Sequence, residues 1–593
     1  MSIPIEDYAL LSNCRTAALV SLHGDLDWLC VPRFDSGSVF GALLGDERHG
    51  RWSLRPTDPD ARVARRYDGD TFILVTTWAT NTGSAQVIDA MPIGDDTVVV
   101  RRVVGLEGVV ELGCDVRFRF DYARAIPWVH QVGTESAPCL RAIAGPDSLE
   151  LRGLQFRGHH HRHTAEFSIA AGQTRDLTLL WRPSYLPGAT PRHVDEMLED
   201  TRRWWQGWSD QTEHDGPYLT EVTRSLLVLR ALTDEQTGGI VAAATTSLPE
   251  SIGGERNWDY RYVWLRDAAL TLEALIAHGF VEIAHQWRDW LLRAVAGDPA
   301  QIQIMYGLAG ERDLPERELT SLPGYEGSAP VRIGNGAVTQ FQADVIGEVL
   351  VALDAARRAG LKEDRFSWSL QQALVEQAID RIDVPDQGLW ETRDAPAMYT
   401  HSRVMVWAAL DTMSRAARAN GLRGDIERWE EQRDRLRAEI DARGYDAERG
   451  HFVQHYGSTA VDGALLLLPQ VGYCTADDPR MLGTVAEIER RLIHDGFVMR
   501  YSTDDGVAGG ENAFLACTFW LVEQYAMVGR LDDAAILMER ACATANDLCL
   551  LSEEYDPRAR RQTGNVPQAF SHLALVRAAD AIGGHGGRAR HRR

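Results

Sequence analysis

Two glutamates in separate segments have neighbours that suit acid–base chemistry. Glu391 follows Trp390 in the segment GLWETR, and Glu553 precedes Glu554 in the segment LSEEYD much later in the chain. A carboxylic acid can give a proton to a leaving oxygen while a carboxylate takes one from water, so two carboxyls in one pocket suffice for a glycosidic hydrolysis. Glutamates are also common on solvated surfaces, and the rest of the chain must decide between the two interpretations.

Several segments mix aromatic side chains with arginines and carboxylates just ahead of expected helices. Besides the two glutamate segments they are ERNWDYRYVWLRDA at 255–268 and MRYSTDDGVAGGE at 499–511. Aromatic faces pack on the C–H faces of sugar rings, and bidentate charged groups bind neighbouring hydroxyls. The 17 tryptophans of the chain suit a sugar pocket, although a large core would use them as well. We therefore expect a carbohydrate site.

Other chemistries leave no trace in the sequence. There is no GxxxxGK[ST], HExxH or GxSxG motif and no GxGxxG after a strand, which disfavours nucleotide hydrolysis, zinc peptidase and serine esterase activity. We expect neither a cofactor nor a metal ion. The HHHRH run at 159–163 is expected on a surface strand or turn, because near-consecutive histidines cannot all converge on one ion.

Composition and charge limit the partners and the compartment. The net charge of −23 disfavours nucleic acid and anionic membranes, because their phosphates would be repelled. No apolar run is long enough to span a bilayer, and the N-terminus is acidic where a signal peptide is basic. The eight cysteines form no CxxC pair and are expected to be reduced. We expect a soluble cytoplasmic protein, and assembly into homo-oligomers stays open.

The segments that must position these residues fall into two classes. Up to about residue 190 the chain alternates short Val-, Thr- and aromatic-rich runs such as VVVRRVVGL and VVELGCDVRFRF with Gly, Asp and Asn. Such runs are typical of half-buried strands and predict an antiparallel β-sandwich over 1–192. A helical linker is expected over 193–220, and 583–593 is expected to be a disordered basic tail.

From residue 221 to 582 nearly every regular segment has helical periodicity. The expected helices are at 221–234, 262–279, 281–297, 340–360, 367–383, 400–421, 426–443, 461–472, 481–493, 511–529, 531–547 and 565–582. Twelve helices make six hairpins, which closes an all-α (α/α)6 barrel. Unusually long loops fall roughly at alternate junctions, so one mouth of the barrel should carry them all. They are 235–261, 298–339, 384–399, 444–460, 494–510 and 548–564.

The motifs TTSLPE, RNWDYRYVWLRD, GLWE and SEEYDP, in that order, resemble those of glycoside hydrolase family 15. This family contains glucoamylases, isomaltose-releasing glucohydrolases and a bacterial type of trehalase. The resemblance runs from PIEDYALLSN near the start to GNVPQAFSHLALV near the end. It implies the same fold that the helix count predicts, a β-sandwich followed by an (α/α)6 barrel.

The resemblance also implies roles for individual residues. Glu391 matches the general acid and Glu553 the general base. Arg266 and Asp267 match a pair that binds the 4- and 6-hydroxyls of the non-reducing-end glucose. The remaining substrate-binding residues implied by the resemblance are Tyr260 near the catalytic water, the pocket walls Trp264 and Trp390, Arg500 at the glucosyl subsite, and Arg332 and Asn335 in the loop VRIGNG.

Two positions depart from the starch-cleaving members of the family. Thr392 follows the expected acid where those enzymes often have a second glutamate, and Glu554 follows the expected base where they often have glutamine. Both are expected near the substrate. No starch-binding module or secretion signal is evident, which favours a small glucoside over polymeric starch.

The sequence thus predicts an exo-acting, inverting α-glucoside hydrolase that releases β-D-glucose from the non-reducing end. Inversion requires the two carboxyls to lie about 6.5–9.5 Å apart so that a water fits between base and sugar. We also expect a raised pKa for the acid and a wetter or cation-supported site for the base. Isomaltose-type oligosaccharides, trehalose and short maltooligosaccharides stay open as substrates. An inverting disaccharide phosphorylase and a non-catalytic sugar-binding protein are the alternatives.

Overall fold

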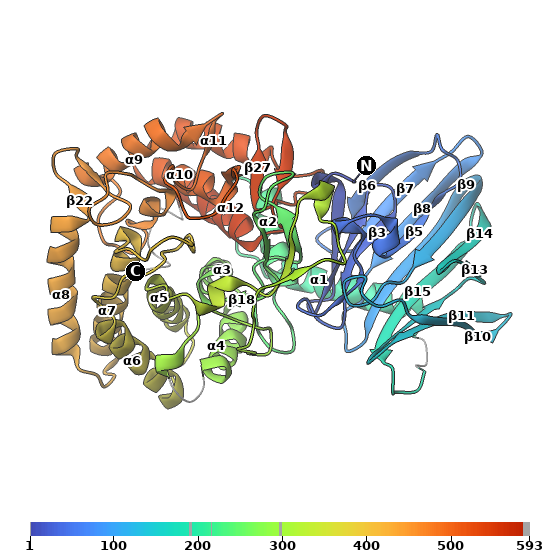
Figure 1. Ribbon diagram of the computed structural model, residues 1–593, viewed down its shortest axis with the longest axis horizontal. Helices are drawn as coiled ribbons and strands as arrows, with labels where there is room; N and C mark the ends of the chain where they lie inside the picture. The colour runs from blue at the N-terminus through green and yellow to red at the C-terminus, as the bar shows by residue number, and fades with distance from the viewer. Residues whose placement is uncertain (1, 189–191, 215, 296–298, 585–593) are drawn as a thin grey trace.

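The computed structural model of the protein describes residues 2–188, 192–214, 216–295 and 299–584. It has two bodies side by side, one built of strands from the N-terminal part and one built mostly of helices (Figure 1). The disordered tail was expected at 583–593, and residues 585–593 lie outside the described residues. None of the described helices is both long and apolar enough to cross a membrane.

The first body contains fifteen described strands, all paired antiparallel in two sheets. One sheet has the order β6-β7-β8-β9-β15-β12-β11-β10, and the other has the order β1-β2-β3-β5-β9-β14-β13 with β4 beside β3. The strands are β1 (Tyr8–Ser12), β2 (Ala17–Ser21), β3 (Asp25–Cys30), β4 (Ser38–Phe40), β5 (Arg51–Pro56), β6 (Arg62–Tyr67), β7 (Leu74–Ala79), β8 (Gly83–Ala90), β9 (Thr97–Arg117), β10 (Trp128–Thr134), β11 (Ala137–Ala144), β12 (Asp147–Arg152), β13 (Arg157–His159), β14 (Arg162–Ala170) and β15 (Thr174–Pro183).

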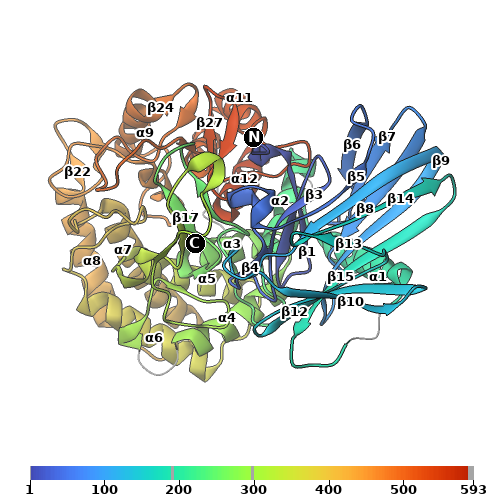
Figure 2. The same cartoon turned by 45° about the vertical axis from the view of Figure 1, so that its right-hand side comes forward.

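Strand β9 belongs to both sheets, which the sequence did not predict. Its first half, from Thr97 to Val104, pairs with β15, and its second half, from Val109 to Arg117, pairs with β14 and β5. Gly108 between the halves has a φ of 58°, and a side chain there would meet the carbonyl of Thr82 at 2.1 Å. The glycines that suggested a break between two strands instead let one long strand pass from sheet to sheet, beside β8 and β14 in Figure 2.

The HHHRH run lies in the hairpin formed by β13 and β14, as expected for a surface segment. His159 to Arg162 are exposed, and His160 and His161 form its turn with positive φ.

The second body is a double ring of helical hairpins. Each outer helix is followed in the chain by an inner one: α2 by α3, α4 by α5, α6 by α7, α8 by the 3-10 helix η7, α9 by α10 and α11 by α12. The bounds are α2 (Leu219–Ala231), α3 (Leu265–Ala277), α4 (Val281–Val295), α5 (Asp344–Arg358), α6 (Arg365–Asp380), α7 (Thr400–Asn420), α8 (Ile426–Arg443), η7 (Gly463–Leu467), α9 (Pro479–Leu492), α10 (Leu515–Met527), α11 (Leu531–Cys542) and α12 (Ala569–Ile582). Helix α1 (Val194–Ser209) precedes them.

Contacts between neighbouring inner elements close the ring. Helix α3 packs on α5, α5 on α7, α10 on α12 and α12 back on α3, while η7 contacts both α7 and α10. The inner helices are apolar nearly all round, and α10 is buried from Leu515 to Tyr525. Outer helix α8 buries only Trp429, Leu436 and Ile440. A helix without a polar face belongs in the interior, and the arrangement confirms the (α/α)6 barrel.

One expected helix is different in the structure. The segment 461–472 forms only the short 3-10 helix η7, followed by turns. Pro469 lacks the N–H that an α-helix needs, and Gly472 has a φ of 77°, so the run of leucines cannot continue as an α-helix.

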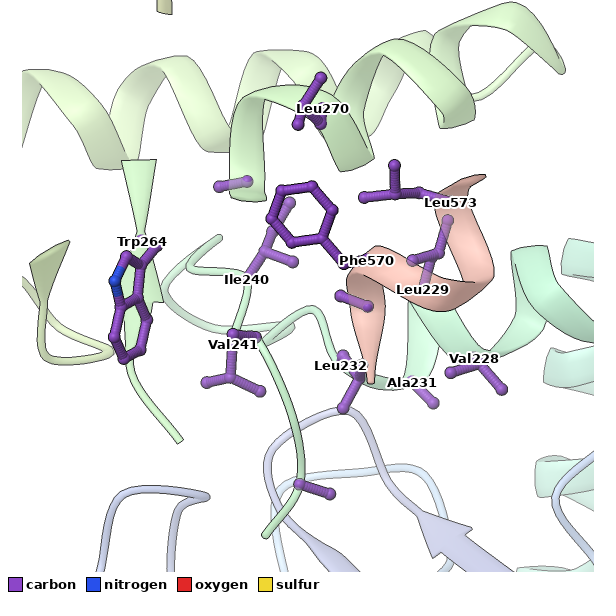
Figure 3. Close-up of a cluster of buried hydrophobic side chains, with 14 of the residues drawn as sticks. Val228, Leu229, Ala231, Leu232, Ile240, Val241, Trp264, Leu270, Phe570 and Leu573 are labelled. Carbon is purple, nitrogen blue, oxygen red and sulfur yellow. The ribbon is translucent and has the colours of Figure 1, made fainter. Parts of the chain in front are cut away.

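The long loops all connect an outer element to the following inner one, as predicted. They therefore lie at the N-terminal ends of the inner helices. Buried side chains of this region come from several helices: Figure 3 shows Phe570 and Leu573 of α12 beside Leu270 of α3, with Leu229 of α2 close by. This packing holds together helices that surround the mouth.

Candidate active site

A pocket opens at the N-terminal ends of the inner helices. Its volume is about 820 Å³ with the open mouth included, a size suited to a small sugar. The residues that precede α3, α10 and α12, namely Trp264, Phe514 and Gln568, all line it. Nine of the twelve expected catalytic and substrate-binding residues line it as well. They are Tyr260, Trp264, Arg266, Asp267, Asn335, Trp390, Glu391, Arg500 and Glu553.

An extended segment ahead of α3 directs alternate side chains into the pocket. It contains the short strands β17 (Asn257–Asp259) and β18 (Val263–Trp264), in which successive side chains point to opposite sides. Trp258, Tyr260 and Trp264 line the pocket. Arg261 points the other way, is fully buried, and donates to Asp259, to the Tyr122 hydroxyl and to the Ser36 carbonyl.

Arg261 therefore joins the back of the pocket to the β-sandwich. Ser36 and Tyr122 belong to the N-terminal body, and the guanidinium also lies 5.8 Å from the ring centroid of Trp28. A buried arginine is stable only when its donors are satisfied, so this contact fixes how the segment carrying Tyr260 is oriented.

Glu391 lies in a tight turn and is held by two donors at the start of α3. Its backbone has a φ of 57°, which a non-glycine residue rarely adopts. Oε1 accepts hydrogen bonds from the indole of Trp264 at 2.7 Å and from Arg266 at 3.2 Å. The side chain is 21% exposed. Gly388, three residues earlier, lies against Tyr399, and a Cβ there would meet that ring at 2.9 Å.

Glu553 lies in a very different environment, since it is only 1% exposed. Oε1 accepts a hydrogen bond from the Tyr260 hydroxyl at 2.8 Å. Burial raises the pKa of the Glu553 carboxyl, the negative charge of Glu250 raises that pKa further, and Arg500 lowers it. Gly564 makes room for the group, because a Cβ at this position would lie 2.6 Å from Glu553 Cβ.

The two carboxyls are linked through two aromatic residues of one strand segment. Trp264 contacts Glu391 and Tyr260 contacts Glu553, and the two rings lie edge to face at 5.6 Å between centroids. Residues distant in sequence are thereby brought to one pocket by the segment that precedes α3.

Arg266 and Asp267 each carry a buried polar atom that lacks a hydrogen-bond partner in the described part of the chain. These atoms are Arg266 Nε and Asp267 Oδ2, which lie 3.6 Å apart. Other donors of Arg266 are used by Gln342 at 2.7 Å and by Glu391. Burial raises the pKa of Asp267 to about 7. An unsatisfied donor and acceptor side by side at a pocket wall are suited to a pair of sugar hydroxyls.

Arg500 is surrounded by three carboxylates on the Glu553 side of the pocket. It pairs with Glu250 at 2.8 Å, with Glu511 at 2.8 Å and with Glu554 at 3.0 Å. These three glutamates are close enough together to ligate a metal ion, but the Arg500 guanidinium occupies the space among their oxygens, and Arg256 lies within 4 Å of two of them.

Three expected substrate-binding residues do not line the pocket. The hydroxyl of Thr392 contacts the Gln387 carbonyl and the Tyr399 hydroxyl, both at 3.1 Å. Arg332 donates to backbone carbonyls and lies over the ring of Trp258. Glu554 is fully buried against Arg500. Thr392 is adjacent to Glu391, and Arg332 and Glu554 contact Trp258 and Arg500, which line the pocket.

Sequence reasoning missed several lining residues. The ring of Trp258 contacts the guanidinium groups of Arg332 and Arg393, at 4.7 and 4.3 Å from its centroid. Arg256 forms a bidentate pair with Asp505 at 2.7 and 2.8 Å. Both Arg256 and Trp258 fall inside the quoted motif, and period two along an extended segment would have identified them.

Glu250 is a missed residue whose negative charge acts on the expected base. It is 1% exposed, lines the pocket, and accepts hydrogen bonds from Trp258 at 3.0 Å and from Arg500 at 2.8 Å. It ends the TTSLPE motif, yet nothing in its own sequence context distinguishes it from a surface glutamate.

Comparison with known sequences gives two family matches. The family "Glycosyl hydrolases family 15" matches residues 216–580, and the family "Trehalase-like, N-terminal" matches residues 1–166. Together they extend over most of the chain.

Individual relatives match nearly the whole length. The chain is 38% identical over 610 residues to a protein named trehalase from Mycolicibacterium smegmatis, which covers 97% of this chain and 90% of the relative. It is 34% identical over 592 residues to a protein named trehalase from Thermoplasma volcanium, covering 98% and 93%. Among solved structures, a bacterial glucoamylase complexed with acarbose matches with a TM-score of 0.76 at 15% identity, covering 98% of this chain and 94% of the other. That likeness supports the fold.

Proposed function

The chain belongs to glycosyl hydrolase family 15 and is a glycoside hydrolase, and on this premise we propose that it is an inverting trehalase. Two relatives named trehalase, at 38% and 34% identity over nearly the full length, support trehalose as the substrate. The N-terminal match to a trehalase-like family supports it as well. Thr392, in place of a second glutamate after the expected acid, is consistent with a substrate other than starch.

The observation that carries the proposal is the pair of carboxyls in one pocket. Glu391 and Glu553 are held by neighbouring residues of one segment, Trp264 and Tyr260. Both line a pocket whose walls combine aromatic faces with charged groups. This combination suits a pyranose ring and its hydroxyls.

Glu391 is the proposed proton donor. Its Oε1 already accepts two N–H bonds, so Oε2 carries the proton and gives it to the oxygen between the two glucose units. As the bond from C1 to that oxygen breaks, the leaving glucose departs with a neutral hydroxyl. Positive charge then develops on the remaining glucosyl unit.

Glu553 is the proposed base. Its carboxylate removes a proton from a water molecule, whose oxygen forms the new bond to C1 on the face opposite the leaving group. The Tyr260 hydroxyl donates to Glu553 Oε1, which leaves Oε2 to receive that proton. Arg266 and Asp267 bind hydroxyls of the same glucose and hold C1 in line with the water.

The anomers of the product test the proposal directly. Both glucose units of trehalose are α-linked, so inversion converts one to β-D-glucose while the leaving unit stays α. Proton NMR in the first moments of the reaction should show equal amounts of both anomers. Retention of configuration would give α-glucose alone and would contradict the mechanism.

A panel of substrates tests whether trehalose is the preferred substrate. We expect kcat/KM for trehalose to exceed that for isomaltose, maltose and panose. A preference for isomaltose or maltose would refute trehalase while leaving a family 15 hydrolase. Formation of glucose 1-phosphate that depends on added phosphate would identify a phosphorylase, and binding without turnover of any of the four would identify a sugar-binding protein.

A further inference from the structure

Two histidines and an aspartate meet at the end of the barrel opposite the pocket. His278 follows α3, Asp580 lies near the end of α12, and His214 lies in the segment between α1 and α2. Their side chains are 3%, 8% and 2% exposed. One ligating atom from each lies within 4.8 Å of the other two. Neither the family resemblance nor the proposed reaction uses this cluster.

Backbone carbonyls determine which ring nitrogen of each histidine carries a hydrogen. His278 Nδ1 lies 3.3 Å from the Glu213 carbonyl, and His214 Nε2 lies 3.1 Å from the Pro217 carbonyl. A carbonyl oxygen can only accept, so each of these nitrogens donates. In a neutral imidazole the other nitrogen then bears the lone pair. Those nitrogens, His278 Nε2 and His214 Nδ1, both face Asp580.

When the rings are protonated, these nitrogens donate to Asp580; when the rings are neutral, the two nitrogens and the carboxylate offer three ligating atoms to one cation. A metal ion can take the place of the protons, and metal-bound histidines commonly donate the N–H of their second ring nitrogen to a backbone carbonyl, as both do here. The cluster therefore has metal ligands together with the outer hydrogen bonds that orient them.

The distances also suit a shared ion. His278 Nε2 lies 3.2 Å and His214 Nδ1 3.5 Å from the Asp580 oxygens. Zinc bound at 2.0–2.1 Å in a tetrahedron places its ligands about 3.4 Å from one another. The His278 distance also fits a direct N–H···O bond, whereas the His214 distance exceeds the usual range of about 2.7–3.2 Å.

We propose that His214, His278 and Asp580 form a structural site for a divalent transition metal of the zinc type. Two imidazoles and a carboxylate are ligands that zinc accepts. The ion would join the segment between α1 and α2 to the C-terminal ends of α3 and α12, where the last inner helix of the ring meets the first. It would stabilise the closure of the barrel, remote from the sugar pocket.

Metal titration of the full-length protein tests the site. After dialysis against a chelator, we expect the protein to bind one equivalent of Zn²⁺ and its Tm to rise with Zn²⁺ concentration. Co²⁺ should bind in its place and give visible d–d absorption of a nitrogen- and oxygen-ligated ion. If the protein binds no stoichiometric Zn²⁺ and its Tm does not change with Zn²⁺ concentration, the proposal is overturned and the cluster is held by hydrogen bonds alone.

Variants assign the binding to these residues. Asp580→Asn, which keeps the shape of the side chain, and His278→Gln should each weaken Zn²⁺ binding by at least about tenfold to a hundredfold. Both should still hydrolyse glucoside when folded, because the pocket lies at the other end of the barrel. Unchanged Zn²⁺ affinity in Asp580→Asn would overturn the assignment.

The exposed histidine hairpin supplies the matched control. A variant with His159, His160 and His161 all replaced by alanine should keep the single equivalent and the Zn²⁺-dependent Tm. Loss of binding in this variant would assign Zn²⁺ binding to the surface hairpin and refute the buried site.

Discussion

The two walls of the pocket present the same functional group in opposite surroundings. On one wall Glu391 is 21% exposed, in a turn with positive φ, and shares Oε1 with two N–H donors. On the other wall Glu553 is 1% exposed, contacts a tyrosine hydroxyl, and lies near Glu250 and Arg500. The first wall is a partly exposed turn held by two N–H donors, and the second is a packed interior.

This difference reverses part of the sequence expectation. We expected a wetter or cation-supported site for the base, and the structure instead buries Glu553, the expected base, which raises its pKa. Arg500 supplies the expected cation, but Glu250 and the loss of water outweigh it. A base of this kind is a stronger proton acceptor once ionised, and it needs a higher pH to become so.

Replacing each carboxyl with its amide tests the comparison of the two walls, and it has the largest expected effect. Glu391→Gln and Glu553→Gln should each reduce kcat for trehalose by about 10²–10⁴-fold, because each removes one proton transfer. Steady-state kinetics on purified variants measures this. Near-normal turnover in either variant would refute the role of that residue.

A substrate with a good leaving group separates the two roles. Fluoride leaves α-D-glucosyl fluoride without needing a protonated acid, whereas the attacking water still needs a base. Glu391→Gln should therefore recover much of its activity on this substrate and Glu553→Gln should not. The opposite result would exchange the two assignments. This outcome is a real test, because the raised pKa of Glu553 is also what a general acid needs.

Each wall has a glycine with positive φ that packs closely on a neighbouring side chain, which gives a matched pair. A Cβ on Gly564 would meet Glu553 at 2.6 Å, and a Cβ on Gly388 would meet the Tyr399 ring at 2.9 Å. Because small displacements of catalytic groups are costly, Gly564→Ala should lower kcat/KM by about 10²-fold. We expect a smaller loss for Gly388→Ala, since its turn is more exposed.

Gly360→Ala is the control for this pair. Gly360 also has a positive φ, 102°, but nothing lies within 4 Å of an added Cβ. It should lose some stability and keep its kcat/KM. If Gly360→Ala reduced turnover as much as Gly564→Ala, backbone strain rather than contact with Glu553 would explain both.

The sequence predicted the elements better than it predicted the surroundings of the carboxyls. Local periodicity and long alternate loops were enough to place the mouth of the barrel, since both depend on neighbouring residues. The long strand β9 and the 3-10 helix η7 depend on tertiary pairing and on single Pro and Gly positions. The burial of Glu553 depends on residues hundreds of positions away, such as Glu250, which no local pattern reveals.

Neutralising Glu250 tests the electrostatics of the buried wall. Its negative charge raises the pKa of Glu553, and Glu553 must be ionised to act as a base. Activity should therefore rise with pH along an acid limb above the ordinary glutamate value of 4.5. Glu250→Gln should move that limb of the kcat/KM profile to lower pH. A limb that stays in place or moves to higher pH would contradict the contribution of Glu250.

The smallest expected effect concerns stability. A carboxyl whose pKa is raised on folding stabilises the protein below its unfolded pKa, and that contribution is lost as pH rises through the folded pKa. Ionised Glu553 is therefore a cost to folding at neutral and higher pH. Glu553→Gln should raise the Tm by a few degrees at pH 8, on the scale of about 2–8 °C per kcal/mol, with the gain shrinking towards pH 4. Glu391→Gln is the matched control, because it removes the negative charge that pairs with Arg266 and should lower the Tm or leave it unchanged. An equal gain in both variants would mean that the two walls do not differ in the way their burial indicates.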